Sequence, residues 1–352
     1  MKENTVELIE FNCAGYLRFI LMLFVCFWAF GCPEPSGIVA ALSGFAIPAF
    51  YILSGYFVLT DDREDRLAKT ARKIRRSLLC FGFMFLLYVA VNVVVFILNH
   101  MTVAITKRVI FNFVVLNLWP LPVGDNIWFI QALLYAYIVI FIADKLKLMR
   151  FYKIIMILLF IVMLLTGELA GVIHFNILGY PYIPGNWLTR ALPYLLLGRF
   201  IREHKDTLLN LRKWVYIAMF VIGGGLVILE MFILGRTGLL IYQGHMLGFG
   251  IMAFGICCLA LSIPIMNGNR VVHLDSSISG LIYIFMNPVY YLLVLFLAAG
   301  HIDFLYYAGG LTAYMASVVI ALIIAGMRPA GWLFTNWDQR LADAVNIEEM
   351  DD

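Results

Sequence analysis

Residues 78–98 of the chain read LLCFGFMFLLYVAVNVVVFIL, a segment without a single charged side chain. The hydrocarbon core of a bilayer is about 30 Å thick, and a helix needs about 20 apolar residues to cross it. Similar segments recur along almost the whole chain: 63% of the 352 residues are hydrophobic, 13% are charged, and the mean hydropathy is +0.92. A soluble domain would carry about twice that charge. The sequence therefore predicts an all-α polytopic membrane protein.

About ten transmembrane helices are expected, within one membrane domain over residues 1–328 that a short cytoplasmic tail at 329–352 follows. The fourth span is the least regular, because Pro120, Pro122 and Gly124 separate a short apolar piece at 109–119 from a better span at 127–143. We interpret the short piece as re-entrant or interfacial. The predicted spans are 12–31, 37–59, 78–98, 110–143 in two parts, 152–173, 187–203, 213–234, 239–264, 277–299 and 303–326.

Lysine and arginine predict the orientation of these spans. The segment 60–77 (TDDREDRLAKTARKIRRS), which we expect to be a loop, carries seven cations, and every second loop after it is also basic. Cytoplasmic loops carry the excess of Lys and Arg. Both termini are therefore expected in the cytoplasm, with the protein in the inner membrane of a bacterium.

The first expected span contains an arginine, in the stretch YLRFILMLFVCFWAFG at 16–31. A cation inside a membrane is costly and usually faces a cavity or a partner. Arg18 lies a turn or two from the cytoplasmic edge, however, so snorkelling to the headgroups is the alternative. Eleven residues further, Ala29 returns to the same helix face at a rise of about 16 Å. Groups at these two positions are placed to engage the two ends of a long substrate.

Several segments accompany Arg18 and together resemble one family. They are IPAFYILSGYFVL at 47–59, RKIRRS at 72–77, the pair Trp128 and Phe129, and SISGLIYIFMNPVYYLL at 277–293. An arginine and a histidine separated by ten residues in the first span, followed by a Pro-x-Phe-Phe-x-x-Ser-Gly-Tyr segment, are typical of the acyltransferase family 3 membrane proteins. The chain resembles this family over nearly its full length.

The chain departs from the family at its histidines. Ala29 stands at the position of the first histidine, and Met286 or Asn287, depending on the alignment, stands at that of a later one. Gly15 replaces a common aspartate. In the family the first histidine is thought to be the base that takes a proton from the acceptor hydroxyl. Since alanine accepts no proton, the resemblance implies that this form is inactive or severely impaired.

The resemblance implies an O-acyltransferase that moves an acyl group from cytosolic acyl-CoA to a hydroxyl on an extracytoplasmic glycan or another cell-surface acceptor. Acetyl is the acyl group that the resemblance favours. Cations would hold the CoA phosphates by charge-assisted hydrogen bonds. The expected donor contacts are Arg18, Arg72, Arg75 and Arg76, and the expected lining residues are Tyr51, Ser54, Tyr56 and Trp128. No permanently bound cofactor, metal or nucleic acid is expected, and the bilayer itself is a partner.

Alternative interpretations stay open for these features. The basic segment would also serve topology and binding of anionic lipids alone, and Ser54 with Gly55 would also serve close helix packing. Glu168, Arg190 and Glu230 fall near the outer ends of their spans, where solvation at the interface accounts for them. The alternative function is a transporter or a membrane protein that binds a small molecule such as an amino acid, like the membrane half of a serine racemase.

Overall fold

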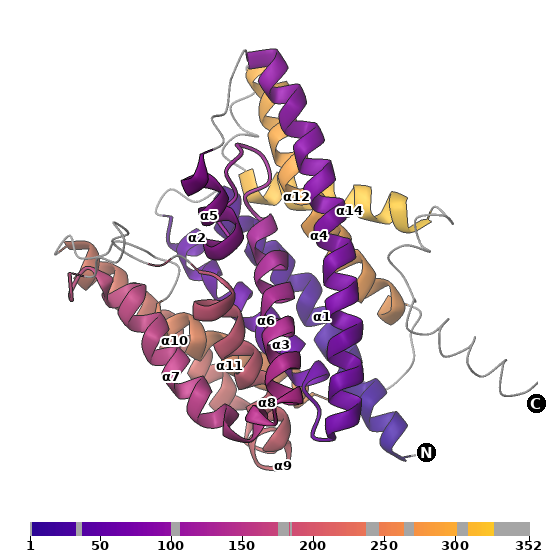
Figure 1. Ribbon diagram of the computed structural model, residues 1–352, viewed down its shortest axis with the longest axis vertical. Helices are drawn as coiled ribbons and strands as arrows, with labels where there is room; N and C mark the ends of the chain where they lie inside the picture. The colour runs from indigo at the N-terminus through magenta and orange to yellow at the C-terminus, as the bar shows by residue number, and fades with distance from the viewer. Residues whose placement is uncertain are drawn as a thin grey trace, which may run out of the picture.

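The computed structural model describes residues 2–32, 37–99, 106–174, 183, 185–236, 246–263, 271–300 and 309–326. Every regular element in these ranges is a helix (Figure 1). In chain order they are α1 (Lys2–Phe30), α2 (Ile38–Leu42), η1 (Ser43–Phe45), α3 (Ala46–Val58), α4 (Arg63–Asn99), α5 (Lys107–Leu116), α6 (Ile127–Lys145), η2 (Leu148–Phe151), α7 (Tyr152–Thr166), η3 (Glu168–Ala170), η4 (Trp187–Ala191), α8 (Leu192–Glu203), α9 (Lys205–Leu208), α10 (Lys213–Arg236), α11 (Leu247–Leu261), α12 (Val271–Gly300) and α14 (Gly309–Gly326).

Five helical segments are long and apolar enough to cross a membrane by length and composition: Ile38–Val58, Arg63–Ile97, Ile127–Lys145, Leu148–Thr166 and Lys213–Arg236. Four shorter apolar helices accompany them, at Ala14–Phe30, Leu247–Leu261, Ile278–Val294 and Gly309–Ile324. The protein is therefore an all-helical membrane protein. The count of ten spans and the cytoplasmic placement of both termini stay predictions, and the tail at 329–352 lies outside the described residues.

The prediction of a loop at 60–77 is wrong for most of that segment. The helix α4 begins at Arg63 and runs without a break into the apolar part that we expected at 78–98. The carboxylate of Asp62 accepts a hydrogen bond from the backbone N–H of Asp65 at 2.7 Å, which caps the helix. Glu64 and Asp65 place negative charge in the first turn, where the helix dipole favours it. The basic residues are consequently arranged on a helix.

The fourth predicted span consists of two separate helices, as the prolines and the glycine between its two parts indicate. The helix α5 has 10 residues, about 15 Å of rise, which is half of what a crossing requires. It ends at Asn117 in the left-handed conformation, and an irregular segment leads from there to α6. The interfacial placement of this short piece stays a prediction.

Other boundaries differ from the predictions at their ends. The first helix begins ten residues earlier than expected, at Lys2. The helix α7 ends at Thr166 instead of residue 173, since Gly167 follows it. The segment at 187–203 begins with a π-helical turn before α8. The described helices α11 and α14 are shorter than 239–264 and 303–326, whereas α12 begins before residue 277.

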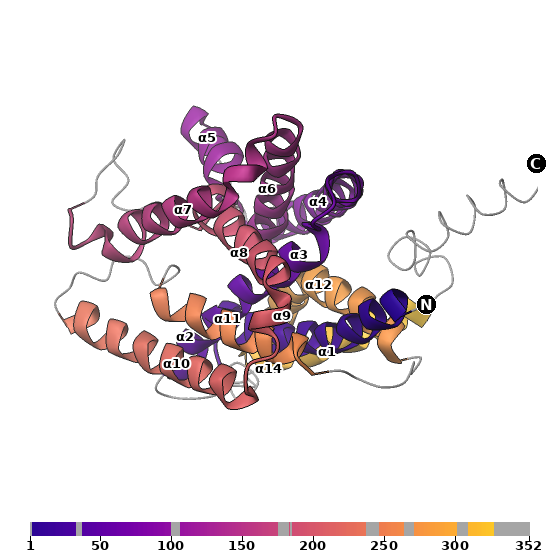
Figure 2. The same ribbon diagram turned by 90° about the horizontal axis from the view of Figure 1, so that it is seen from below.

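The helix α3 lies at the centre of the bundle and is surrounded by α1, α4, α8 and α11 (Figure 2). Its closest approach is to α8, and two glycines make that approach possible. A Cβ atom at Gly55 would lie 2.0 Å from the carbonyl oxygen of Leu195, and one at Gly198 would lie 2.1 Å from that of Ile52. Small residues allow helix backbones to meet in this way. For Gly55 the packing interpretation is therefore correct.

The outer helices present apolar side chains to the surroundings. Only about a fifth of the most apolar window of α4, α7 and α10 is buried inside the protein, against 61% for α3. Large side chains such as Leu86, Ile97 and Val221 are 65% exposed or more. Water would not stabilise such a surface, but lipid tails solvate it well. This distribution supports the membrane assignment independently of sequence composition.

Candidate functional site

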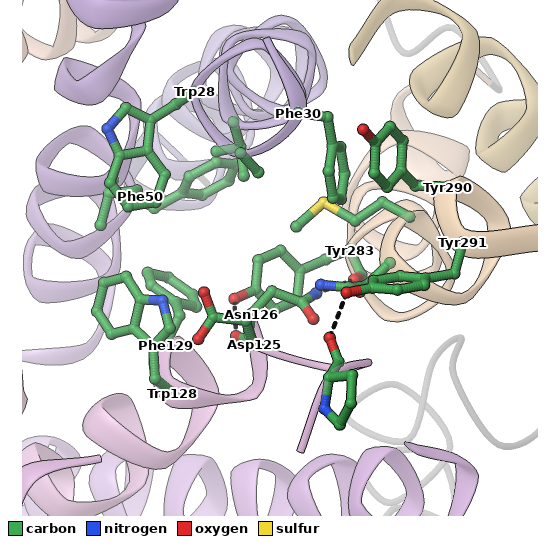
Figure 3. Close-up of a pocket in the computed structure, with 16 residues that line it drawn as sticks. Trp28, Phe30, Phe50, Asp125, Asn126, Trp128, Phe129, Tyr283, Tyr290 and Tyr291 are labelled. Atoms are coloured by element: carbon green, nitrogen blue, oxygen red, sulfur yellow. Dashed lines mark hydrogen bonds between the residues drawn. The ribbon is translucent and has the colours of Figure 1, made fainter. Parts of the chain in front are cut away.

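The structure contains a pocket of about 320 Å³ between α1, α3, α12 and the irregular segment that precedes α6 (Figure 3). Aromatic rings form most of its wall, and a few polar groups interrupt them, which is the usual composition of a ligand site. The lining residues are Val25, Trp28, Ala29, Phe30, Ile47, Phe50, Pro122, Asp125, Asn126, Trp128, Phe129, Tyr283, Met286, Asn287, Tyr290 and Tyr291.

The positions at which the chain lacks the expected histidines meet in this pocket. Ala29 lines it from α1, and both Met286 and Asn287 line it from α12. More than 250 residues of sequence separate Ala29 from Met286, so their shared wall is a property of the fold alone. The alignment ambiguity between Met286 and Asn287 therefore does not change the location of the second position.

A proline shapes the part of α12 that carries these residues. Pro288 lies inside the helix and has no N–H to donate to the carbonyl of Ile284, four residues earlier. The hydroxyl of Tyr88 donates to that carbonyl oxygen instead, at 2.9 Å. The carbonyl is therefore satisfied from the neighbouring helix α4, and Met286 and Asn287, just before the proline, line the pocket.

The irregular segment that carries Asp125 is fixed by hydrogen bonds on both sides. The amide of Asn92 on α4 donates to the carbonyl of Val123 at 2.7 Å and accepts from its N–H at 3.0 Å. From α12, the side chain of Asn287 accepts from the N–H of Gly124 at 3.2 Å. Gly124 itself has a φ of +107°, and a Cβ there would lie 2.2 Å from the ring of Tyr88. Only glycine fits this turn.

Asp125 places a carboxylate at the pocket wall, beside Trp128 and Tyr283 (Figure 3). The residue is exposed to solvent, but the neighbouring side chains desolvate it in part, which raises the pKa of the Asp125 carboxyl above its ordinary value. Sequence reasoning missed this residue. It is the only acidic residue between Thr106 and Ala143, and that isolation was the available signal.

Arg190 is buried next to the pocket between two tryptophans. Its guanidinium carbon lies 5.7 Å from the ring centre of Trp28 and 5.6 Å from that of Trp128, both of which line the pocket. The side chain is 0% exposed, and its three nitrogens have no hydrogen-bond partner among the described residues. Two cation–π contacts compensate part of its desolvation. The expectation that solvent at the interface accounts for Arg190 is wrong.

Glu168 and Glu230 are likewise buried instead of solvated. Both carboxylates meet the start of α11, where Glu168 accepts from the N–H of Leu247 at 3.0 Å and Glu230 from that of Gly248 at 3.5 Å. Acidic side chains at a helix N-terminus interact favourably with its dipole. Burial raises the pKa of the Glu168 carboxyl, which lies outside the spanning segments.

Arg18 belongs to a second polar group, which lies nearer the N-terminus of α1 than the pocket does. Its guanidinium lies 5.2 Å from the ring centre of Phe57 and interacts electrostatically with Tyr137 and Arg76. The Tyr137 hydroxyl also lies close to Ser54. The structure thus brings three predicted residues, Arg18, Ser54 and Arg76, together around a tyrosine that the sequence did not single out.

The face of α1 between these two sites is packed. Met22, Val25 and Cys26 are all at most 4% exposed, and the Cys26 sulfur lies 3.8 Å from that of Met286. The pocket reaches along α1 only as far as Val25. Arg18 is seven residues further, about 10 Å along the helix axis. Position 18 therefore does not line the pocket of position 29.

The remaining predicted residues lie in different surroundings. Tyr51 is fully buried and stacks on Phe129, with ring centres 4.6 Å apart, so it supports the pocket wall from behind. Tyr56 packs under the guanidinium of Arg202, away from the pocket. Arg72 and Arg75 are exposed on α4. Trp128 lines the pocket as predicted.

Arg66, in the same basic segment, has a structural role. It is 4% exposed and makes two hydrogen bonds of 2.8 Å to the carboxylate of Asp144 at the end of α6. It also donates to the carbonyl of Thr60 at 2.7 Å. A planar guanidinium suits this bidentate contact. Not every cation of the segment is therefore available to a ligand.

The fold and the pocket define an all-helical membrane protein with an aromatic pocket between α1, α3 and α12. The chain belongs to the acyltransferase-3 family, because the model of that family's acyltransferase domain matches residues 11–327, nearly its whole length. It is thus a membrane acyltransferase by family. No curated protein and no solved structure matches it.

Proposed function

We propose that this protein is an O-acyltransferase that moves an acetyl group from cytosolic acetyl-CoA to a hydroxyl of an extracytoplasmic glycan or cell-surface acceptor, in the inner membrane of a bacterium. The observation that carries the proposal is the meeting of Ala29 with Met286 and Asn287 in one aromatic pocket. Residues at which the family resemblance expects histidine converge there from two distant helices, so the pocket is the natural reaction centre.

The acceptor half of the proposal is supported by the pocket wall. Aromatic rings with a few fixed polar groups bind the apolar faces of an organic molecule while hydrogen bonds orient it. Asn126 and Asn287 supply amide groups at the wall, and the segment that carries them is fixed by its own hydrogen bonds. An acceptor bound there would present its hydroxyl close to position 29.

The donor half rests on the cations of α1 and α4. Arg18 and Arg76 lie within electrostatic reach of each other, and like charges held together favour binding of an anion such as a CoA phosphate. Arg72 and Arg75 extend the positive charge along α4. A donor held at Arg18 must bring its thioester about 16 Å along α1 to position 29. Because Met22, Val25 and Cys26 fill the face between the two sites, these side chains must move for the donor to pass.

The alanine at position 29 limits the rate in this proposal. General-base catalysis contributes about 10²–10⁴-fold to such reactions, and a methyl group supplies none of it. We therefore expect Ala29→His to raise the rate of transfer, by about a hundred-fold or more where no other group of the pocket accepts the proton. The family's imidazole would take the acceptor proton as the oxygen attacks the thioester.

The test is an assay of Ala29→His in inside-out membrane vesicles of the expressing strain, which supply the acceptor. Radiolabelled acetyl-CoA is added outside, and both label in the glycan fraction and release of the CoA thiol are followed. Ala29→Asn is the matched control, because it adds a polar side chain of similar reach without a group that titrates near neutral pH. Absence of acetyl transfer by the histidine, asparagine and alanine forms alike would contradict the proposal.

Ligand stabilisation separates this function from the transport alternative, which neither the fold nor the family favours. Acetyl-CoA, and not a series of amino acids, should raise the melting temperature of the purified protein. Arg18→Ala should abolish that shift if the donor binds where we propose. Stabilisation by an amino acid alone would favour transport instead.

A further inference from the structure

The pocket has an alanine at position 29, where the family resemblance expects a histidine, but it contains an ionisable acid. Of the sixteen residues that line it, Asp125 is the one with a carboxylate. Asp125 comes from the segment before α6, on the wall that faces α1, α3 and α12. The carboxylate therefore shares the space in which an acceptor hydroxyl would lie beside Ala29.

The surroundings of this carboxylate contain little that would neutralise it. Tyr283 and Tyr291 on α12 interact with its charge, and Tyr290 lines the same pocket. The buried cation Arg190 packs against the ring of Trp128, 5.6 Å from its centre. The linings from α1 and α3 add only apolar and aromatic side chains, and no described residue forms an ion pair with Asp125.

An aromatic wall without a counter-charge makes a carboxylate a better proton acceptor. Asp125 is exposed to solvent, but the rings beside it remove part of its hydration, which disfavours the charged form and raises the pKa of its carboxyl. A base is most effective when its pKa approaches the working pH. An ordinary surface aspartate, with a pKa of about 4, would be a poor base for a hydroxyl by comparison.

Asp125 is also held in a fixed position, which a catalytic group requires. On one side of it, the N–H of Gly124 donates to Asn287 at 3.2 Å. On the other side, the amide of Asn126 donates to the carbonyl of Tyr283 at 2.9 Å, and the Tyr283 hydroxyl donates to the carbonyl of Asn126. Both neighbours of Asp125 are thus tied to α12, which carries the second histidine position.

We propose that Asp125 is the general base of this chain and replaces the histidine that position 29 lacks, an inference that rests on the proposed acetyl transfer. The Asp125 carboxylate takes the proton from the acceptor hydroxyl as its oxygen attacks the thioester carbonyl of acetyl-CoA. The new C–O ester bond forms, the C–S bond breaks, and the electron pair leaves with the CoA sulfur. The proton on Asp125 then passes to the CoA thiolate, which leaves as the thiol.

The experiment compares four forms of the full chain in the same vesicle assay: the chain as it stands, Asp125→Asn, Ala29→His, and the double variant. Asparagine keeps the size of the side chain and removes only its ability to accept a proton. We expect Asp125→Asn to lower the rate of the chain as it stands by about a hundred-fold or more. In the Ala29→His background the same change should cost less than about ten-fold, because the imidazole provides a second base.

This comparison separates a catalytic role from a structural one. A residue that merely shapes the pocket would lower the rate equally in both backgrounds. Melting temperature and stabilisation by acetyl-CoA should be the same for Asp125→Asn as for the unchanged chain. The rate of the chain as it stands should rise with pH through the pKa of the carboxyl, whereas the Asp125→Asn form should lose that rise.

Each possible outcome is decisive. Equal rates for the chain as it stands and for Asp125→Asn would overturn the inference. So would an inactive chain whose Ala29→His form is active, although the proposed function would survive that result. Inactivity of all four forms toward acetyl-CoA would refute the proposed function together with the inference.

Discussion

The contact between α3 and α8 leads to a prediction with a built-in control. We consider Gly198→Ala, which adds one methyl group on the face of α8 that meets α3. The added Cβ would lie 2.1 Å from the carbonyl oxygen of Ile52 and 2.6 Å from the backbone nitrogen of Tyr56. Both neighbours are helix backbone, so neither can rotate away as a side chain would.

The structure gives the size of the effect. An ordinary contact begins at 3.4 Å, so α3 and α8 must separate by about 1.3 Å to accept the methyl group, and packing in a well-filled interior resists such shifts. Extra atoms in a tight core usually cost about 1–3 kcal/mol. Because the clash is with backbone, we expect the upper end, about 3 kcal/mol, and a fall in melting temperature of about 5 °C or more.

The assay is thermal unfolding in detergent micelles, with Gly225→Ala as the control. Gly225 lies inside α10, and a Cβ there meets nothing within 4 Å. Alanine favours a helix over glycine by about 0.5–1 kcal/mol, so the control should melt at the same temperature or slightly higher. If Gly198→Ala melted together with the control, the close approach of α3 and α8 would be refuted.

Three further perturbations test other parts of the structure by the same measurement. Arg66→Ala leaves the buried carboxylate of Asp144 without its bidentate partner and should cost about 3–5 kcal/mol. Asn92→Ala removes the acceptor of the buried Val123 N–H, which should cost about 1–3 kcal/mol and loosen the segment that carries Asp125. Glu168→Gln tests the pH dependence of stability. Because the pKa of this buried carboxyl is raised, its contribution to stability is present below the ordinary pKa and is lost as pH rises through the raised value. The glutamine variant should therefore show a smaller fall in melting temperature as pH rises.

Controls for these variants are available nearby. Lys69 forms an exposed pair with Asp65, and Lys69→Ala should change stability by less than about 1 kcal/mol. A loss of stability for Arg66→Ala no larger than this would contradict the stabilising role of the buried contact between Arg66 and Asp144. Unchanged stability of Asn92→Ala would mean that Val123 finds another partner, and an unchanged pH profile for Glu168→Gln would mean that Glu168 is solvated after all.

The helical membrane fold could be predicted from the sequence because long apolar segments allow few alternatives. The ends of the helices could not. The charge of residues 60–77 predicts a loop, but the residues after Asp62 are good helix formers, and the contact between Arg66 and Asp144 holds them against α6. Ends of helices depend on such caps and tertiary contacts, and a hydropathy pattern does not record them.

The candidate site was predictable in part. Ala29, Met286 and Asn287, which the family resemblance singled out, line one pocket, and their catalytic role stays a prediction. The arrangement of Arg18 around Tyr137 and the placement of Arg190 between two tryptophans depend on contacts between residues far apart in sequence. Asp125 was overlooked because it lies in a connecting segment, where an acidic residue is ordinarily solvated and does not indicate a functional site.

The unbroken course of α4 has a consequence for how its exposed arginines can select a partner. At 37 residues the helix is about 55 Å long, well beyond the thickness of the hydrocarbon layer. Its interior amides are engaged within the helix, so a polyanion that binds at Arg72 and Arg75 meets exposed side chains and no main-chain donors. Such a surface distinguishes ligands by their net charge, and added salt weakens their binding to it. Recognition of finer chemical differences between ligands then falls to residues inside the bundle.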